Sequence, residues 1–356
     1  MKLNSLRTYS SRNARGSDEL ATVFAQKLVG QTAAIDAIVP YVRMHQAGLS
    51  PEGRPVAVFM LLGPTGTGKT RTVEALAEVL HGSAKKMLKV DCGEFQMEHE
   101  VAKLVGAPPG YLGHRETQPM LNQQKLNGAS SESSDLSIVL FDEIEKAASS
   151  MTRLLLGVLD KATLRLGDNT TVNFEKSIIF LTSNLGARTM MKELKPNFGF
   201  EAVLPRPAIG PLPHNSRKKL QNIGLAAVRR KFSPEFVNRL DSVITYQPLG
   251  HDSLAAILDQ QIVHLQEHID RRLGIDSFHL DVLPRTRRFL LKIGSSQEYG
   301  ARELKRTLQR QMVQPLADLL AAGEIDAGSV LIVDVNEARS KIVLRPQPAD
   351  DYPLAS

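Results

Sequence analysis

One stretch has the residue types and the spacing of a phosphate-binding loop: Gly63-Pro64-Thr65-Gly66-Thr67-Gly68-Lys69-Thr70. Glycines let backbone N–H groups turn toward phosphate oxygens, Lys69 can reach the β- and γ-phosphates, and the Thr70 hydroxyl can take one position on Mg²⁺. An apolar run at residues 56–62 precedes the loop, and a helical pattern at residues 69–80 follows it. A phosphate would then lie at a helix N-terminus, where unpaired N–H groups and the helix dipole favour an anion. The stretch therefore predicts a site for a nucleoside triphosphate with Mg²⁺.

Two adjacent carboxylates end a second apolar run. Residues 137–141 read Ser-Ile-Val-Leu-Phe, and Asp142 and Glu143 follow them. A phosphate loop needs an acidic strand end to complete its metal site, so we expect Asp142 to hold Mg²⁺, directly or through water. Glu143 points elsewhere and can orient and deprotonate the attacking water. Together with the loop, the pair predicts hydrolysis of the nucleotide.

Two further segments have types and spacing that suggest chemistry or recognition. Ser233 and Pro234 suit the cap and first position of a short helix that presents Arg239; the alternative is a surface arginine paired with Asp241. Residues 106–113 form a loop with one aromatic side chain, Tyr111, between glycines. A tyrosine makes sequence-tolerant apolar contacts with little loss of rotamer entropy, which suits gripping many polypeptides; alternatively, it only fills a turn.

Strands and helices must hold these side chains in place. Strand-like runs at residues 56–62, 87–90, 137–141, 177–181 and 242–246 alternate mostly with helical stretches, which predicts a parallel α/β sheet wrapped by helices. After Pro248 the pattern changes to two amphipathic helices and two short alternating runs, at residues 330–335 and 341–344. We therefore expect a basic tail at 1–17, a large α/β domain at 18–247, a small, mainly helical domain at 248–346 and a tail at 347–356.

Composition limits the partners and the compartment. The 356 residues include 44 basic and 38 acidic side chains, for a net charge of +6, and one cysteine, Cys92. The charge is modest and spread along the chain, so we expect no nucleic-acid partner. No apolar run approaches the about 18 residues of a membrane span, so we expect no membrane partner. A single cysteine favours a reducing compartment: the bacterial cytoplasm or, if the basic N-terminal residues are a transit peptide, the mitochondrial matrix.

The motifs resemble, in order, those of the Clp-type AAA+ ATPases, and most closely the second nucleotide-binding module of the disaggregases. The resemblance runs from about residue 28 to residue 344 and includes Asp142-Glu143 with Glu145-Lys146-Ala147, Thr182-Ser183-Asn184 and Tyr299-Gly300-Ala301-Arg302. It implies that Leu28 and Val29 contact adenine. It also implies that Asn184 helps to position the water near the γ-phosphate and that Arg302 reads the nucleotide from the small domain.

The resemblance also implies an assembly. Arg239 would be an arginine finger supplied to the neighbouring subunit, and Tyr111 with Leu112 would be the loop that pulls polypeptides through a central pore. Residues 198–200 (Phe-Gly-Phe) resemble the tip by which some Clp unfoldases dock a peptidase. This chain departs from the family in an insert at residues 127–135 and in Ser233, which stands where arginine is frequent.

We therefore expect an AAA+ P-loop NTPase fold: a parallel five-stranded sheet plus a small, mainly helical C-terminal lid domain with a short sheet. The expected function is an ATP-dependent unfoldase or disaggregase, forming a homo-oligomeric ring, in the family a hexamer, that threads unfolded or aggregated proteins. Lys69 and Thr70 would bind phosphate and Mg²⁺, and Glu143 would be the base. Three alternatives remain: an ATP-regulated assembly that holds a partner without threading it, the unfoldase component of a peptidase complex, and a nucleic-acid remodelling protein.

Overall fold

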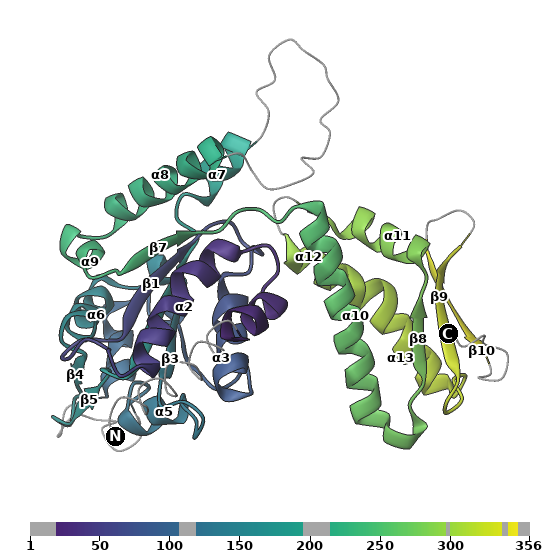
Figure 1. Cartoon of the computed structure of the whole chain (residues 1–356), viewed down its shortest axis with the longest axis horizontal. Coiled ribbons are helices and arrows are strands. Elements are labelled where there is room, and N and C mark those ends of the chain that lie inside the picture. The colour runs from purple at the N-terminus through teal and green to yellow at the C-terminus, as the bar shows by residue number, and fades with distance from the viewer. Residues whose placement is uncertain (1–18, 107–118, 195–213, 297–299, 337–340, 348–356) are drawn as a thin grey trace, which may run out of the picture. The chain divides into compact units, whose positions relative to one another are not determined.

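The computed structural model describes residues 19–106, 119–194, 214–296, 300–336 and 341–347. Apart from short segments, the residues up to Gln247 form one compact unit, and the residues from Pro248 onward belong to a second one (Figure 1). Among the described residues, no helix combines the length and the apolar character needed to cross a membrane.

The first unit is built on a five-stranded parallel sheet. Its strands are β1 (Ala57–Leu62), β2 (Leu88–Asp91), β3 (Ser137–Asp142), β6 (Ser177–Ser183) and β7 (Ser242–Thr245), in the order β2-β3-β6-β1-β7. All residues of β1 and β6 are buried, because helices cover both faces of the sheet. Strands buried on both faces have near-continuous apolar sequences, which is why the sequence pattern located them. The predicted parallel five-stranded sheet is confirmed.

Helices on the two faces of this sheet enclose two cores (Figure 1). The helices are α2 (Thr32–Gln46), α3 (Lys69–His81), α4 (Ala102–Val105), α5 (Gln123–Gly128), α6 (Ser149–Lys161), α7 (Ala187–Leu194), α8 (His214–Lys231) and α9 (Pro234–Asn238). Alternate side chains of β1 belong to different cores: Phe59 packs with α2 and α3, and Met60 packs in the cluster that includes α6 and α9. This alternation follows from the two-residue repeat of a strand.

A short hairpin that the sequence did not predict follows α6. Its strands are β4 (Thr163–Arg165) and β5 (Thr171–Asn173), and each buries only its central residue, Leu164 or Val172. The 3₁₀ turns Cys92–Glu94, Glu98–Val101 and Ile144–Lys146 also lie in the first unit.

The second unit is mainly helical with a three-stranded sheet, as expected. It contains α10 (His251–Leu273), β8 (His279–Val282), α11 (Pro284–Gly294), α12 (Ala301–Leu308), a π-helical turn (Gln309–Val313), α13 (Gln314–Ala322), β9 (Val330–Val335) and β10 (Ile342–Gln347). In the sheet β10-β9-β8, β9 pairs antiparallel with β10 and parallel with β8. Side chains from α10, α11, α12 and the sheet form one core, which includes Leu258, Leu290, Leu304 and Leu331. Neither β8 nor α11 was predicted from the sequence.

Candidate active site

The glycine loop connects the end of β1 to the start of α3, as the sequence predicted. Gly63 has φ 145°, and Gly68, the residue before α3, has φ 99°. A Cβ atom on Gly63 would lie 2.7 Å from the Tyr246 carbonyl oxygen and 2.9 Å from Tyr246 Cβ. Both contacts are closer than real Cβ atoms approach other atoms, and one of them is to backbone. Glycine is therefore required at position 63 for steric as well as conformational reasons.

Gly63→Ala is expected to lower the free energy of unfolding by about 1–3 kcal/mol more than Gly82→Ala does. Both positions have positive φ, but only at Gly63 would the new Cβ clash with neighbouring atoms, and overpacking typically costs that much. Gly82 is the matched control: it ends α3 with φ 72°, but a Cβ there would meet nothing within 4 Å. Urea denaturation measures both variants, and equal losses would contradict the close approach of Tyr246. Nucleotide affinity should fall only in Gly63→Ala.

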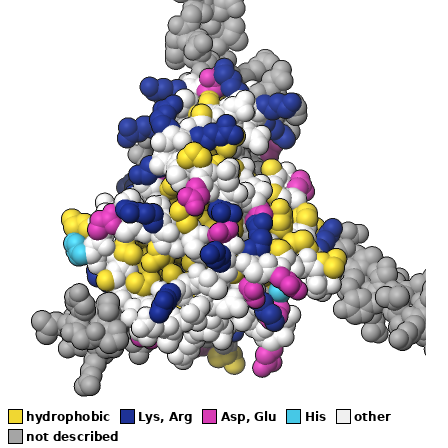
Figure 2. Space-filling model, turned by 90° about the vertical axis from the view of Figure 1, so that its left-hand side faces the viewer, with side chains coloured by type: hydrophobic (Ala, Val, Ile, Leu, Met, Phe, Trp, Pro, Cys, Tyr) yellow, Lys and Arg dark blue, Asp and Glu magenta, His cyan; other side chains and the backbone are white. Residues whose placement is uncertain are grey.

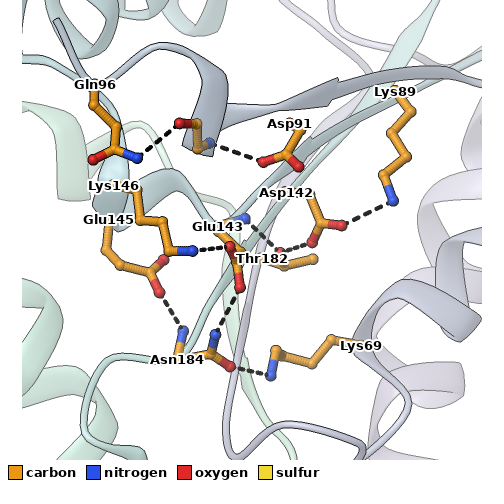
Figure 3. A network of polar contacts seen from close by, with 11 residues as sticks. Lys69, Lys89, Asp91, Gln96, Asp142, Glu143, Glu145, Lys146, Thr182 and Asn184 are labelled. Atoms are coloured by element: carbon orange, nitrogen blue, oxygen red, sulfur yellow. Dashed lines mark hydrogen bonds and ion pairs between the residues drawn. The ribbon is translucent and has the colours of Figure 1, made fainter. Parts of the chain in front are cut away.

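Lys69 is buried at the start of α3, and its ammonium group is held by three oxygen atoms. Nζ donates to the carbonyl oxygens of Gly63 and Pro64, at 2.7 and 2.9 Å. It also donates to Asn184 Oδ1 at 2.9 Å (Figure 3). Asn184 directly follows β6, so the lysine joins the glycine loop to the end of a neighbouring strand. These three partners are neutral oxygens, and a phosphate would form stronger, charge-assisted hydrogen bonds with the ammonium group than they do.

Asp142 is the last residue of β3, and two side chains hold its carboxylate. Thr182, from β6, donates its hydroxyl to Asp142 Oδ1, and Lys89, from β2, lies 3.0 Å from Oδ2 (Figure 3). The Thr182 hydroxyl also accepts the backbone N–H of Glu143 at 3.0 Å. Neighbouring parallel strands thus fix the acidic strand end, and Lys89 offsets part of its charge.

The next residue, Glu143, leaves the strand in the left-handed conformation, with φ 56°. Its carboxylate contacts Lys146 Nζ through Oε2, and Oε1 accepts from Asn184 Nδ2 at 3.4 Å (Figure 3). The hydrogen bond with Glu143 raises the pKa of Lys146, so this amine stays charged. A non-glycine residue with positive φ is uncommon and such strain concentrates at functional sites. The Glu143 side chain therefore takes a different direction from that of Asp142. This difference is needed if Asp142 is to hold Mg²⁺ and Glu143 is to act on the water.

Asn184 connects the two halves of this cluster. Its side chain accepts from Lys69 and donates to Glu143, while its backbone N–H donates to Glu145 Oε1 at 3.0 Å. The glycine loop, the acidic strand end and Asn184 are therefore one polar network. No role was predicted for Lys89, and Thr182 and Glu145 were named only as parts of the family-like motifs. Thr182 and Glu145 lie near the carboxyl ends of β6 and β3, whereas Lys89 is the second residue of β2.

The oxygen donors present suit Mg²⁺ bound together with a nucleotide. No group of three or more His, Cys, Asp or Glu side chains that could hold a metal ion occurs in the described part of the chain. Mg²⁺ commonly uses one or two protein oxygens with water and phosphate completing its shell. The Thr70 hydroxyl and the Asp142 carboxylate fit this pattern, provided that the Lys89 ammonium group moves away from Asp142 Oδ2.

The other predicted site residues are not part of this network, and some of them lie outside the described residues. Leu28 is buried, and its Cδ1 lies 3.9 Å from where a Cβ on Gly68 would be, whereas Val29 is half-buried. Arg302 is exposed in the first turn of α12, in the second unit. Tyr111, Leu112 and residues 198–200 are outside the described residues, so their roles stay predictions.

Arg239 follows α9 and pairs with Asp160 of α6, with Nη1 and Oδ1 2.7 Å apart. The predicted alternative, a pair with Asp241, is wrong. Asp241 instead binds Arg54 through both oxygens, at 2.6 and 2.7 Å, and accepts the Val58 N–H at 2.8 Å. Figure 2 shows the side of the molecule on which α8 and α9 lie, where basic side chains gather above an area with exposed hydrophobic ones.

The parallel sheet, the glycine loop after β1 and the acidic end of β3 define a P-loop ATPase domain of the AAA type. Residues 54–243 match the family described as "AAA domain (Cdc48 subfamily)". Residues 249–333 match the "C-terminal, D2-small domain, of ClpB protein". The chain therefore belongs to the AAA+ ATPases, and within them to the Clp type with a ClpB D2-small domain.

Curated relatives and solved structures agree with this assignment. Chaperone protein ClpB of Meiothermus ruber is 34% identical over 308 residues, 86% of this chain and 33% of the relative. ClpB of Mycobacterium leprae is 35% identical over 330 residues, 93% and 34% of the two chains. The fold also matches Hsp104 in its closed state with ATPγS and FITC casein (TM-score 0.77, 28% identity) and Hsp104 of S. cerevisiae in an extended complex with casein (TM-score 0.76, 28% identity). These matches cover 94% and 92% of this chain, but 52% of each Hsp104 chain. The chain thus spans about a third of the matched ClpB proteins.

Proposed function

We propose that this chain is the motor module of a protein-remodelling machine: copies assemble into a ring, a hexamer as the family implies, and hydrolyse ATP at sites shared by adjacent subunits. Lys69 and Thr70 bind phosphate and metal, and Asp142 organises Mg²⁺, which would supply charge neutralisation. Glu143 deprotonates the water that Asn184 helps to position, and Arg302 reads the nucleotide from the lid.

One observation supports a site shared between subunits. Arg239 lies near the end of the sheet where β1 begins, whereas the glycine loop of the same subunit lies at the end where β1 finishes. Asp241, two residues after Arg239, donates its N–H to the Val58 carbonyl at 2.9 Å, near the beginning of β1. The loop begins at Gly63, after the carboxyl end of the same strand. At about 3.3 Å per residue, the strand between Val58 and Gly63 spans ~16 Å. An arginine side chain does not bridge this distance, so a role for Arg239 in hydrolysis requires the active site of another copy.

The surface beside Arg239 supports a protein contact there. A pocket of about 250 Å³ lies between α6 and the start of α9, with Leu156, Phe232 and Phe236 on its apolar side and Arg153 and Lys231 among its polar lining residues. The rings of Phe232 and Phe236 stack at 4.9 Å. Apolar centres with a polar rim are typical of subunit interfaces.

The Tyr111 loop is the proposed contact with the polypeptide. The described residues on either side of it are held together: Met120 and Leu121 donate their N–H groups to the carbonyls of Lys103 and Leu104, at 3.1 and 3.0 Å. The described residues 103–104 and 120–121, which flank the proposed contact in the sequence, therefore lie side by side.

Tyr111→Ala is expected to leave ATP turnover within about twofold of wild type, because the role proposed for Tyr111 is contact with the polypeptide and not with the nucleotide. It is also expected to abolish unfolding of a tagged fluorescent protein. Tyr111→Phe is the control: it retains the aromatic ring of the side chain, so it should retain the activity of unfolding the tagged protein. Loss of fluorescence during ATP turnover measures both. Unfolding by Tyr111→Ala at the wild-type rate would refute threading and favour the alternative, an ATP-regulated assembly that holds its partner.

Two finer assignments are also proposals. Docking of a peptidase through residues 198–200 would make the module the unfoldase of a degradation complex. The single cysteine, Cys92, is buried and free, and burial, followed by the surrounding carboxylates, raises the pKa of its thiol. An inert free thiol suits a reducing compartment such as the cytoplasm.

A further inference from the structure

Arg239 is anchored on both sides in the sequence, so its main chain has little freedom. On one side, Ser233 caps α9 by accepting the Phe236 N–H at 3.3 Å, and Phe236 is buried in the core. On the other side, Asp241 is tied to β1 and to Arg54. What remains to be set is the direction of the long Arg239 side chain.

Asp160 sets that direction through the 2.7 Å ion pair with Nη1. Among the described residues, no other hydrogen bond or ion pair of the Arg239 side chain is found, so its remaining N–H donors are free to bind phosphate oxygens. The guanidinium group has five such donors in a fixed fork, and one carboxylate contact orients all of them.

The position of Asp160 is unfavourable for the helix that carries it. Asp160 is the next-to-last residue of α6, where the helix dipole disfavours a negative charge. The helix end is rigid: Ala162 adopts φ 51°, its N–H donates to the Val158 carbonyl, and its carbonyl accepts the Phe174 N–H at 2.6 Å. Because the helix dipole disfavours a carboxylate at this position, we take Asp160 to be there for its interaction with another residue. That residue is Arg239.

We propose that Asp160 is a positioning residue: it orients Arg239 of its own subunit toward the ATP bound by the neighbouring subunit. The proposal rests on the proposed function, in which Arg239 acts across a subunit interface. It adds that each subunit prepares its arginine with a carboxylate from α6, the helix that begins six residues after Glu143.

Asp160→Asn is expected to lower the turnover number for ATP by about 10- to 100-fold, the range expected when a reacting group is misplaced by about 1 Å. The KM for ATP should stay within about twofold, and the melting temperature should not change measurably, because exposed ion pairs contribute little to stability. A side chain that merely supported the fold would instead lower stability and activity together.

The matched control is Asp259→Asn in the second unit. Asp259 pairs with Arg287 at the same distance, 2.7 Å, and the two side chains are 52% and 44% exposed, against 35% and 39% for Asp160 and Arg239. The control should keep wild-type turnover. Equal turnover in both variants would overturn the proposal.

Mixed assemblies show whose active site Asp160 serves. A Glu143→Gln subunit contributes an intact Asp160–Arg239 pair to its neighbour but does not itself hydrolyse ATP. When Asp160→Asn protein is mixed with an excess of Glu143→Gln protein, the turnover per Asp160→Asn subunit should rise. The reference is wild-type protein mixed with Glu143→Gln in the same ratio, and the turnover per subunit should reach that of wild type in this reference mixture. Asp160→Glu, which restores the charge, should recover part of the turnover without mixing.

Mixing Arg239→Ala with Glu143→Gln distinguishes a failure of the role proposed for Asp160 from a failure of the proposed function. If Arg239→Ala is rescued and Asp160→Asn is not, Asp160 serves its own active site and this inference is wrong, while the shared site stands. If neither variant is rescued, Arg239 does not act across an interface, and the proposed function fails together with the inference.

Discussion

Arg239→Ala is expected to lower the turnover number for ATP by about 10³-fold or more, because an arginine finger contributes about 10³–10⁵ to the rate. The affinity for ATP should change little, since each subunit binds the phosphates through its own glycine loop and Lys69. Stability should fall by about 1 kcal/mol or less, because the Asp160–Arg239 pair is partly exposed. Steady-state kinetics and thermal unfolding give all three quantities.

Two controls accompany this variant. Arg287→Ala removes an arginine from an equivalent ion pair in the second unit and should retain wild-type turnover. Arg239→Lys keeps a positive charge but loses the planar fork, so it should recover only a small part of the rate. Turnover by Arg239→Ala above a tenth of wild type would contradict the role of Arg239 as an arginine finger.

Glu143→Gln is expected to lower turnover by about 10²- to 10⁴-fold, the usual contribution of a general base. The amide keeps the shape of the side chain and its hydrogen bond with Asn184 but cannot take up a proton. ATP binding should persist, so the ATP-bound assembly should accumulate and be detected by sedimentation with bound nucleotide.

The control for this second variant is Glu175→Gln, at the opposite end of β6 from the site, where the carboxylate accepts the Gly53 N–H at 3.1 Å. It should hydrolyse ATP at the wild-type rate. Normal turnover by Glu143→Gln would remove Glu143 from the mechanism. A strictly monomeric Glu143→Gln protein in saturating ATP would contradict a site shared between subunits.

The sheet and the polar network could be predicted because both follow from buried strands. Strands such as β1 and β6 lie between two helical layers, so their sequences are continuously apolar and their carboxyl ends mark the site. The strands β4, β5 and β8 escaped prediction because each has only three or four residues, of which one is buried in β4 and in β5 and two are buried in β8. So short a pattern carries no distinct period.

The partners of individual ion pairs between residues far apart in sequence could not be predicted. The sequence suggested Asp241 as a partner for Arg239 because the two are neighbours, but Asp160, 79 residues earlier, is the partner found. Asp241 is occupied instead by Arg54 and the β1 backbone. Which carboxylate an arginine meets depends on how α6 and α9 pack, and no local pattern encodes that packing.

The separation of Gly63 and Arg239 by the length of β1 restricts the symmetry of any active assembly. A two-fold dimer joins the same patch of both copies. In the proposed function, by contrast, one copy presents the end of the sheet with Arg239 to the end with the glycine loop in the next copy, which is a heterologous contact. An open pair joined in this way completes one site and leaves the other without its arginine. Only a closed ring gives every active site its arginine, so the full activity per subunit requires the closed ring. Dilution that opens the ring leaves at least one site without its arginine and therefore lowers the activity per subunit.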